Sequence, residues 1–471
     1  MADDLAFATI AELNAKLKKR EVSAVELTGA FLNRLETLGP QHNALALAFR
    51  KPALKKAKDV DGDIKRERFR GPLQGIPFGV KDLLTVAGSP TTWGAKPYAT
   101  QVFDQTATIV KKLDKTGAIL IGKLAMVELA GGGGYRFPSA SLTGPGLNPW
   151  DRNRWTGGSS SGSGAAVAAG MVGFALGSET SGSILTPAAY CGVTGLRPTY
   201  GLVSRAGAMA LSWTLDKIGP MCRSAQDCGF VLDTIAGGDA ADPGSAQKSF
   251  YYAPQYARDL KEIRIGFAPA DFDVLVEPST RAAFNEALGI VKSLGMKVQE
   301  TALPDFPYQA ITGTIIACEA ASIFEQLITS GKVDELADQR QAQGLKAGLE
   351  IPAKDYLKAM RIRTLVQAAF QELFANVDVL VAPARYTPAT KVTDPLDRST
   401  PAPGRPKGMS GLVAAGNLAG LPALSLPCGL PGGLPIGLQL VGRPWSENLL
   451  LKVGGEFQTR TDWHRRRPPV A

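Results

Sequence analysis

Short apolar runs of strand length alternate with longer amphipathic segments along the chain. Residues 76–80, 377–382 and 436–441 are predominantly apolar and are typical of buried strands. Residues 23–38 and 446–458 carry apolar positions at helical spacing. This alternation favours an α/β sheet, which the C-terminal runs would complete. No internal repeat or shift in composition divides the chain, so one domain is predicted.

The stretch at residues 155–187 departs from that alternation. A Gly/Ser run at 157–164 has no hydrophobic period, and we expect neither helix nor strand there. The small apolar residues of 165–171 predict a buried helix, and a second Gly/Ser turn ends at Ser183. Turns normally lie at the surface, yet Glu179 is the only charged residue of this stretch. We therefore expect it inside the protein, carrying the chemistry.

Composition and charge narrow the class of protein. The 471 residues are 45% hydrophobic and 20% charged, as in an ordinary globular protein, with a net charge of +9. Basic residues are dense only at 51–70 and 465–467, so we expect no nucleic-acid partner. No run approaches the roughly 18 apolar residues that span a membrane, and the N-terminus lacks the apolar core of a signal peptide. Five cysteines without a CxxC pair indicate reduced thiols and a cytoplasmic location.

Histidine is scarce, and this excludes several mechanisms. His42 lies in a polar turn and His464 in the Arg-rich tail. A hydrolase with a histidine base, or a zinc site with several histidine ligands, would have to use one of these poorly placed residues. We expect no metal and no cofactor.

Three familiar motifs match only in part. Residues 158–162 fit G-x-S-x-G, but the nucleophile elbow needs a preceding strand and a later histidine, and only His464 follows. Residues 245–248 fit S-x-x-K without a K-T-G partner. The Gly-rich run lacks the lysine of a P-loop and the third glycine of a dinucleotide turn. All three interpretations are disfavoured.

Lys81 directly follows the apolar run at 76–80. A serine needs a base to become a nucleophile, and a lysine can serve if burial lowers its pKa. The alternative, an amine that reaches the surface, stays open. Glycines 131–134 either line a roomy pocket or form a flexible turn. The proline-rich residues 383–406 form either a lid or a disordered surface loop.

Three long motifs carry a family resemblance. They are GxPxGVKD around Lys81, NPWDxxRWTGGSSSGSGAAVAAG, and GSETSGSIxxPAAYCGVTGLRPTYG. In this order they resemble the amidase signature family, from about Gly71 onward and least at 237–375. The resemblance implies one large α/β domain with a mixed, twisted sheet covered by helices on both faces. Residues 1–70 would add N-terminal helices to the core, and residues 71–471 would form the amidase signature domain.

The resemblance also implies a catalytic triad without histidine. Lys81 would be the base, Ser159 would relay the proton after a cis peptide bond, and Ser183 would be the nucleophile that forms an acyl-enzyme. The oxyanion hole would consist of backbone N–H groups of Thr180, Ser181, Gly182 and Ser183.

Departures from the family pattern suggest the substrate. Where relatives have Asp-Thr-Gly-Gly-Ser-Ile-Arg, this chain has Glu179 through Leu185 with Ser181 in the turn. The lost arginine argues against an anionic substrate, so we expect hydrolysis of neutral aryl or alkyl amides, with esters and carbamates (urethanes) as further substrates. The expected substrate-binding residues are Ala130, Gly131, Gly132, Gly133 and Leu185.

The expected partners follow from this substrate. They are a small-molecule amide or carbamate, with no nucleic acid and no membrane, and the chain would be a monomer or homodimer. The alternative is the A-like subunit of a glutamine-dependent tRNA amidotransferase, which needs a partner and tRNA. A catalytically inactive homologue is disfavoured because all three triad positions are intact.

Overall fold

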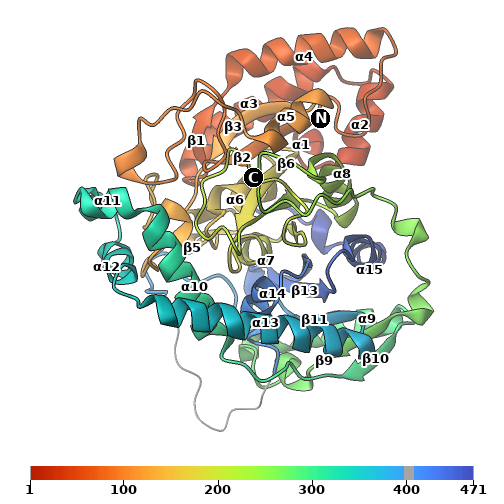
Figure 1. The fold of residues 1–471 in the computed structure, drawn as a ribbon. Helices are drawn as coiled ribbons and strands as arrows, with labels where there is room; N and C mark the ends of the chain where they lie inside the picture. Colours follow the sequence, from red (N-terminus) through yellow and green to blue (C-terminus); the bar gives the residue numbers. More distant parts are fainter. Residues whose placement is uncertain (1, 397–407, 470–471) are drawn as a thin grey trace.

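A mixed sheet of eleven strands organises the computed structural model, which describes residues 2–396 and 408–469 (Figure 1). The strand order is β1-β3-β2-β6-β8-β7-β12-β13-β11-β9-β10. Its strands are β1 (Leu45–Ala48), β2 (Pro77–Lys81), β3 (Ile119–Leu124), β6 (Phe174–Glu179), β7 (Thr194–Arg197), β8 (Lys217–Cys222), β9 (Arg264–Phe267), β10 (Lys297–Glu300), β11 (Val379–Pro383), β12 (Ala423–Gly429) and β13 (Ile436–Gly442). A separate pair consists of β4 (Leu147–Asn148) and β5 (Asp151–Trp155). The C-terminal β12 and β13 lie inside the sheet, which confirms the expected single α/β unit.

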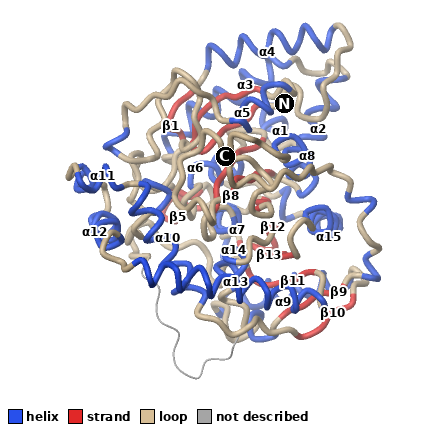
Figure 2. Tube along the Cα trace, in the orientation of Figure 1, coloured by secondary structure: helices blue, strands red, loops and turns tan. Residues whose placement is uncertain are grey.

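Helices cover both faces of this sheet (Figure 2). They are α1 (Ala2–Ala6), α2 (Ile10–Lys18), α3 (Ala24–Gln41), α4 (Arg50–Lys65), α5 (Thr108–Lys115), α6 (Ser161–Ala168), α7 (Leu185–Cys191), α8 (Ala225–Ile235), α9 (Arg281–Ser293), α10 (Tyr308–Ile323), α11 (Glu325–Thr329), α12 (Gln339–Gly348), α13 (Ala353–Asn376), α14 (Leu412–Leu418) and α15 (Glu447–Thr459). Successive residues of a strand face opposite sides. On β7, Thr194 accepts a hydrogen bond from Gln458 of α15, whereas Gly195 packs against Ala188 of α7.

The N-terminal helices pack onto the same core as the sheet. Ser23 and Glu26 form a capping box at the start of α3. Leu27 and Phe31 of this helix are buried in one cluster with Phe78 of β2. The division of the chain at residues 70 and 71 stays a prediction.

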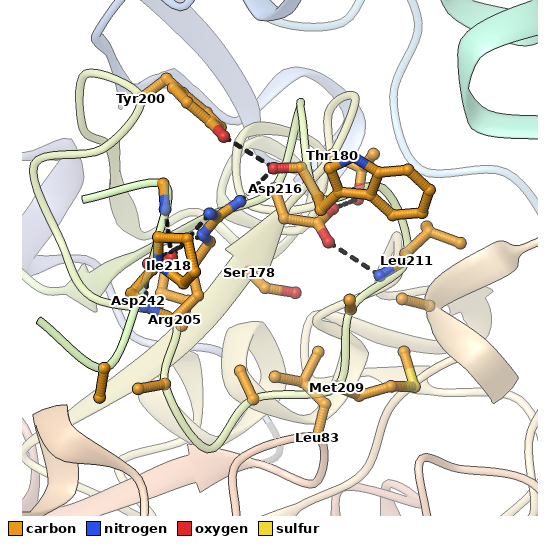
Figure 3. Close-up of a pocket in the computed structure, with 18 residues that line it drawn as sticks. Leu83, Ser178, Thr180, Tyr200, Arg205, Met209, Leu211, Asp216, Ile218 and Asp242 are labelled. Atoms are coloured by element: carbon orange, nitrogen blue, oxygen red, sulfur yellow. Dashed lines mark hydrogen bonds and ion pairs between the residues drawn. The ribbon is translucent and has the colours of Figure 1, made fainter. Parts of the chain in front are cut away.

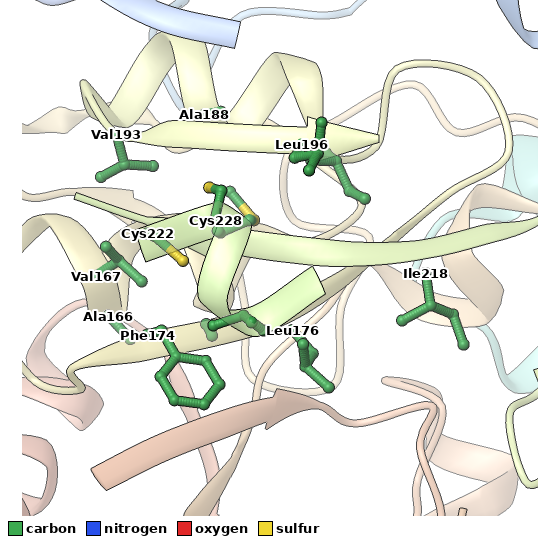
Figure 4. Packing of buried hydrophobic residues seen from close by; sticks show 14 of the residues in the cluster. Ala166, Val167, Phe174, Leu176, Ala188, Val193, Leu196, Ile218, Cys222 and Cys228 are labelled. Atoms are coloured by element: carbon green, nitrogen blue, oxygen red, sulfur yellow. The ribbon is translucent and has the colours of Figure 1, made fainter. Parts of the chain in front are cut away.

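The two strands that lead to the expected catalytic residues lie side by side in the centre. β2 pairs in parallel with β6, and Phe78 stacks on Phe174 with ring centroids 5.1 Å apart. Around them the core is filled by small and apolar side chains of α6, β6 and β8 (Figure 4). This dense packing fixes the strand ends from which the site is built.

The structure differs from one expectation about loops, and the choice between a lid and a surface loop at 383–406 stays a prediction. Helix α6 begins at Ser161, inside the Gly/Ser run where no helix was expected. The glycines of this run serve close packing of the helix against neighbouring segments, because a Cβ at Gly162 would lie 2.5 Å from the carbonyl oxygen of Ala44. Of residues 383–406, the described part packs on β5, where the backbone N–H of Trp155 donates to the carbonyl of Thr390 at 2.8 Å. Residues 397–406 lie outside the described residues.

Candidate active site

Lys81 ends β2 with its side chain completely buried. Its Nζ donates to Oγ of Ser159 at 2.7 Å and to Oγ of Ser178 at 2.9 Å. Burial lowers the pKa of Lys81 to about 7, although the charges of Asp216 and Glu179 partly oppose that shift. The alternative of an amine at the surface is therefore wrong, and a neutral amine is available near neutral pH.

Ser159 lies in the turn before α6, after a cis peptide bond to Gly158. Its hydroxyl faces Lys81, and its carbonyl accepts a hydrogen bond from the N–H of Val127 at 3.1 Å. The side chain is 1% exposed. The structure thus brings two of the three expected triad residues into direct contact.

Ser183 lies in the turn between β6 and α7 and is 9% exposed. Its carbonyl accepts from the N–H of Ser160 at 3.3 Å, which ties this turn to the turn of Ser159. Within residues 2–396 and 408–469, no hydrogen bond joins the hydroxyls of Ser183 and Ser159. Ser183, the third expected triad residue, is therefore linked to the turn of Ser159 by a backbone hydrogen bond, whereas its hydroxyl is not bonded to the Ser159 hydroxyl.

The carboxylate of Glu179 holds the Ser183 turn in place. One oxygen accepts from the N–H groups of Ile184 and Leu185 at 2.9 and 3.0 Å. The other accepts from Arg197 at 2.8 Å and from Asn417 at 2.9 Å. Burial alone would raise the pKa of Glu179, but Arg197 and these hydrogen bonds lower it to about 2. Glu179 is therefore ionised and fully hydrogen-bonded.

The turn that precedes α7 leaves backbone donors available. In the part of the chain that the structure describes, the N–H groups of Ser181, Gly182 and Ser183 have no acceptor. Gly182 has a φ of +91°, a conformation that favours glycine. Such free N–H groups beside a serine have the character of an oxyanion hole.

A cavity of about 510 Å³ lies beside this region (Figure 3). Ser178 points into its centre, so the cavity borders Lys81 through that hydroxyl. The wall is largely apolar. Its apolar lining includes Leu83, Ala130, Met209, Leu211, Trp213 and Ile218.

The expected substrate-binding residues are only partly in this cavity. Ala130 lines it. A Cβ at Gly132 would lie 2.9 Å from the Leu211 side chain, and one at Gly133 would lie 2.3 Å from the Gln341 carbonyl, so both glycines permit close packing. Leu185 is buried in a separate apolar cluster. Substrate contact at Gly131, Gly132, Gly133 and Leu185 stays a prediction.

Sequence reasoning missed Ser178 and Asp216. Ser178 is the second hydroxyl partner of Lys81. Asp216 accepts from Thr180 Oγ1 at 2.6 Å and from the N–H of Leu211 at 2.8 Å, which joins the cavity wall to the Ser183 turn. The position of Ser178 in the second Gly/Ser turn was the available signal for this residue. Nothing in the local pattern pointed to Asp216.

The described residues contain neither a metal-binding cluster nor a membrane-spanning helix. No group of three or more His, Cys, Asp or Glu side chains in residues 2–396 and 408–469 could hold a metal ion. Within the same residues, no helix has the length and apolar character to cross a membrane. The cytoplasmic location stays a prediction.

Comparison with known proteins places this geometry in a family. The family model described as Amidase matches residues 26–451. The chain is 36% identical over 501 residues to the A subunit of glutamyl-tRNA(Gln) amidotransferase from Carboxydothermus hydrogenoformans, covering 99% of this chain and 100% of that protein. The solved peptide amidase of Stenotrophomonas maltophilia matches with a TM-score of 0.83 at 31% identity, over 98% of both chains. The solved A subunit of the same amidotransferase from Thermotoga maritima matches with a TM-score of 0.78 at 27% identity, over 99% of this chain and 98% of that chain.

These relatives correct the expected partners. A small-molecule substrate, no nucleic acid, and a monomer or homodimer were the expectation from charge and pocket residues. The curated relative is instead named as one subunit of an amidotransferase for glutamyl-tRNA(Gln), and so is the solved Thermotoga maritima structure. These relatives contradict the expected partners. The expectation was wrong because neither the density of charge nor a pocket motif reveals a surface that binds another protein chain. From its motifs, its fold and these matches, the chain belongs to the amidase signature family, the amide C–N hydrolases.

Proposed function

We propose that this protein hydrolyses amide C–N bonds through Ser183, with Ser159 as proton relay and Lys81 as base. One observation carries the proposal: the fully buried Lys81 lies 2.7 Å from the Ser159 hydroxyl. Its pKa of about 7 makes the neutral amine abundant at neutral pH.

The reaction begins with the attack of Ser183 on the amide carbonyl. Ser159 takes the proton of Ser183 while Lys81 accepts the proton of Ser159, and the hydroxyls of Ser159 and Ser183 come into hydrogen-bond reach in the substrate complex. The oxyanion is stabilised by the free N–H groups of the Ser183 turn. The proton then passes to the departing amine, the C–N bond breaks, and an acyl-enzyme remains. Water then attacks the carbonyl of the acyl-enzyme and loses a proton to the same groups. The bond between the acyl carbon and Ser183 Oγ breaks, the carboxylic acid leaves, and that proton restores the Ser183 hydroxyl.

The relatives favour a glutamine-dependent role within an amidotransferase. A protein that matches essentially the whole chain at 36% identity bears the name of the A subunit of such an enzyme. In this role, the amide would be that of glutamine, and the released ammonia would be passed on for transfer to glutamyl-tRNA(Gln) by further subunits.

A second candidate is hydrolysis of uncharged aryl or alkyl amides, with esters and carbamates as further substrates. The largely apolar cavity favours it. Among the described residues that line the cavity, the cation is Arg205. Its guanidinium is already paired with Asp242 at 2.8 Å, which also favours an uncharged substrate.

Covalent labelling tests the proposed chemistry. A serine-directed sulfonyl fluoride followed by peptide mapping should label Ser183, and the Ser183→Ala variant should not be labelled. Label on Ser160 would contradict the triad and support the nucleophile elbow. Absence of label in a folded protein would indicate an inactive homologue.

Product measurements separate the two candidates. Ammonia release from L-glutamine is measured with the purified chain, alone and with the other subunits of an amidotransferase and glutamyl-tRNA(Gln). An aryl amide, its ester and its carbamate are measured in parallel. Release from glutamine that rises with the added subunits supports the amidotransferase role. Turnover of the aryl substrates alone supports the second candidate.

A further inference from the structure

A loop beside the active site is bound at both ends to the start of α12. At one end, the carboxylate of Glu128 accepts from the N–H groups of Ala337 and Asp338, each at 3.0 Å. At the other end, the carboxylate of Asp338 accepts from the N–H groups of Arg136 and Phe137 at 2.6 and 3.0 Å. We call these four hydrogen bonds the clasp. They join segments about 200 residues apart in the chain.

The clasp is buried although α11 and α12 lie at the edge of the molecule (Figure 1). Glu128 is 1% exposed and Asp338 is 7% exposed. Asp338 also caps α12 by accepting from the N–H of Arg340, and Gln341 donates to the backbone carbonyl of Glu128 at 2.8 Å. Hydrogen bonds from N–H groups to a buried carboxylate are among the stronger ones in proteins.

The clasped loop contacts the catalytic groups from one side. The N–H of Val127, directly before Glu128, donates to the carbonyl of Ser159. Ala130 forms part of the cavity wall. The hydroxyl of Tyr135 lies close to Gly158, the residue before Ser159, since a Cβ at Gly158 would be 3.2 Å from it. The loop thus touches both the relay serine and the cavity.

The backbone of this loop needs support from outside. Leu129 and Ala130 have φ values of 49° and 54°, which side-chain-bearing residues seldom adopt. Surrounding structure must enforce such conformations. Helix α12 provides that support at close range, because a Cβ at Gly344 would lie 1.8 Å from the carbonyl oxygen of Gly133.

We propose that Glu128 and Asp338 are positioning residues of the active site. Through the clasp, α12 holds the loop that places Ser159 and the Ala130 wall, so that a helix outside the catalytic sheet sets the geometry of the proton relay. This inference rests on the proposed function of Ser159.

The decisive variants are Glu128→Gln and Asp338→Asn. Glu128→Gln puts an NH₂ group against a clasp N–H in either orientation of its amide. Asp338→Asn puts an NH₂ group against either the two clasp N–H groups or the N–H of Arg340, and so weakens the attachment of the loop or the start of α12. Asp334→Asn is the matched control, because its carboxylate is exposed, lies four residues before Asp338 and, within residues 2–396 and 408–469, binds the side chain of Lys346 alone. Folded sites are counted by complete sulfonyl fluoride labelling, and kcat on an amide is expressed per labelled site. Misplacement of a catalytic group by about 1 Å costs about 100-fold. We therefore expect kcat to fall by about 10- to 100-fold in both variants and to be unchanged in the control.

A double-mutant cycle tests whether the two carboxylates act through one loop. The combined variant should lose little more activity than either single variant, because each releases the same loop. Gly344→Ala should reproduce the loss by displacing α12, whereas Gly313→Ala on α10, where no atom lies within 4 Å of the added Cβ, should not.

Hydrogen exchange provides a readout that needs no activity. Peptides that cover residues 128–137 should exchange faster in Asp338→Asn and Glu128→Gln than in the wild type. Unchanged kcat per labelled site, unchanged exchange, or additive losses in the cycle would each overturn the proposal. A wild-type protein that is neither labelled nor active would instead overturn the proposed function, while the exchange result would still decide the clasp.

Discussion

The carboxylate of Glu179 and the guanidinium of Arg197 form an ion pair of 2.8 Å in which both side chains are fully buried. Because the same carboxylate binds the first N–H groups of α7, the pair links β7 to the turn of the nucleophile. Removing one partner leaves an uncompensated buried charge, which typically costs about 3–5 kcal/mol.

Glu179→Gln should therefore lower the free energy of unfolding by about 3–5 kcal/mol, as measured by urea denaturation. Asp334→Asn breaks an exposed ion pair with Lys346 and should cost no more than about 1 kcal/mol. Equal losses in the two variants would contradict a structural role for the buried pair.

The carboxylate of Glu179 also predicts how the stability of the protein depends on pH. Its folded pKa of about 2 lies below the ordinary 4.5, so its contribution is present above pH 4.5 and is lost as the pH falls toward 2. With about 1.4 kcal/mol for each tenfold change in proton affinity, the contribution is about 3 kcal/mol. Denaturation curves between pH 5 and 2 should show this loss in the wild type and a smaller one in Glu179→Gln.

The Lys81 amine predicts the pH profile of catalysis. A base must be neutral, so kcat/KM should rise with pH and level off above about pH 7. Lys81→Met should abolish this limb and lower kcat by about 100-fold or more. Lys81→Arg should not restore activity, because a guanidinium stays protonated. A limb that persists in Lys81→Met would assign the titration to another group.

Ser178 should affect the pKa of the Lys81 amine. Its hydroxyl accepts from Nζ, so Ser178→Ala removes a partner of the protonated form and should shift the rising limb to lower pH. Loss of one such hydrogen bond should cost about tenfold in kcat/KM. Ser178→Thr keeps the hydroxyl and should retain the wild-type limb. Identical profiles for the wild type and Ser178→Ala would exclude this role.

Gly182 should be essential to the turn of Ser183. At its φ of +91°, a Cβ is strained and would lie 3.2 Å from Thr186 Oγ1. Displaced oxyanion donors cost about 100- to 1000-fold in kcat, so Gly182→Ala should reduce kcat by about that factor. Gly88→Ala has a comparable φ of +72° with no atom within 4 Å, and should change stability without changing kcat.

Local patterning was sufficient for much of the fold. The apolar run before Lys81 is β2, and the runs at 377–382 and 436–441 are β11 and β13, because a strand buried on both faces is recognisable from its composition alone. The start of α6 at Ser161 was not predictable, since its glycines serve contacts with Ala44 and other distant residues rather than helix propensity.

The sequence by itself identified the chemical groups: two serines in Gly-rich turns, a lysine at a strand end, and too few histidines for the usual base. Only the tertiary structure decided how they meet. The pairing of β2 with β6 brings Ser178 to Lys81, and the clasp brings α12 to the loop beside Ser159. These contacts join residues about 100 and 200 positions apart, and no local period encodes such distances. They depend on the close packing of the folded chain, which also lowers the pKa of the lysine by excluding water.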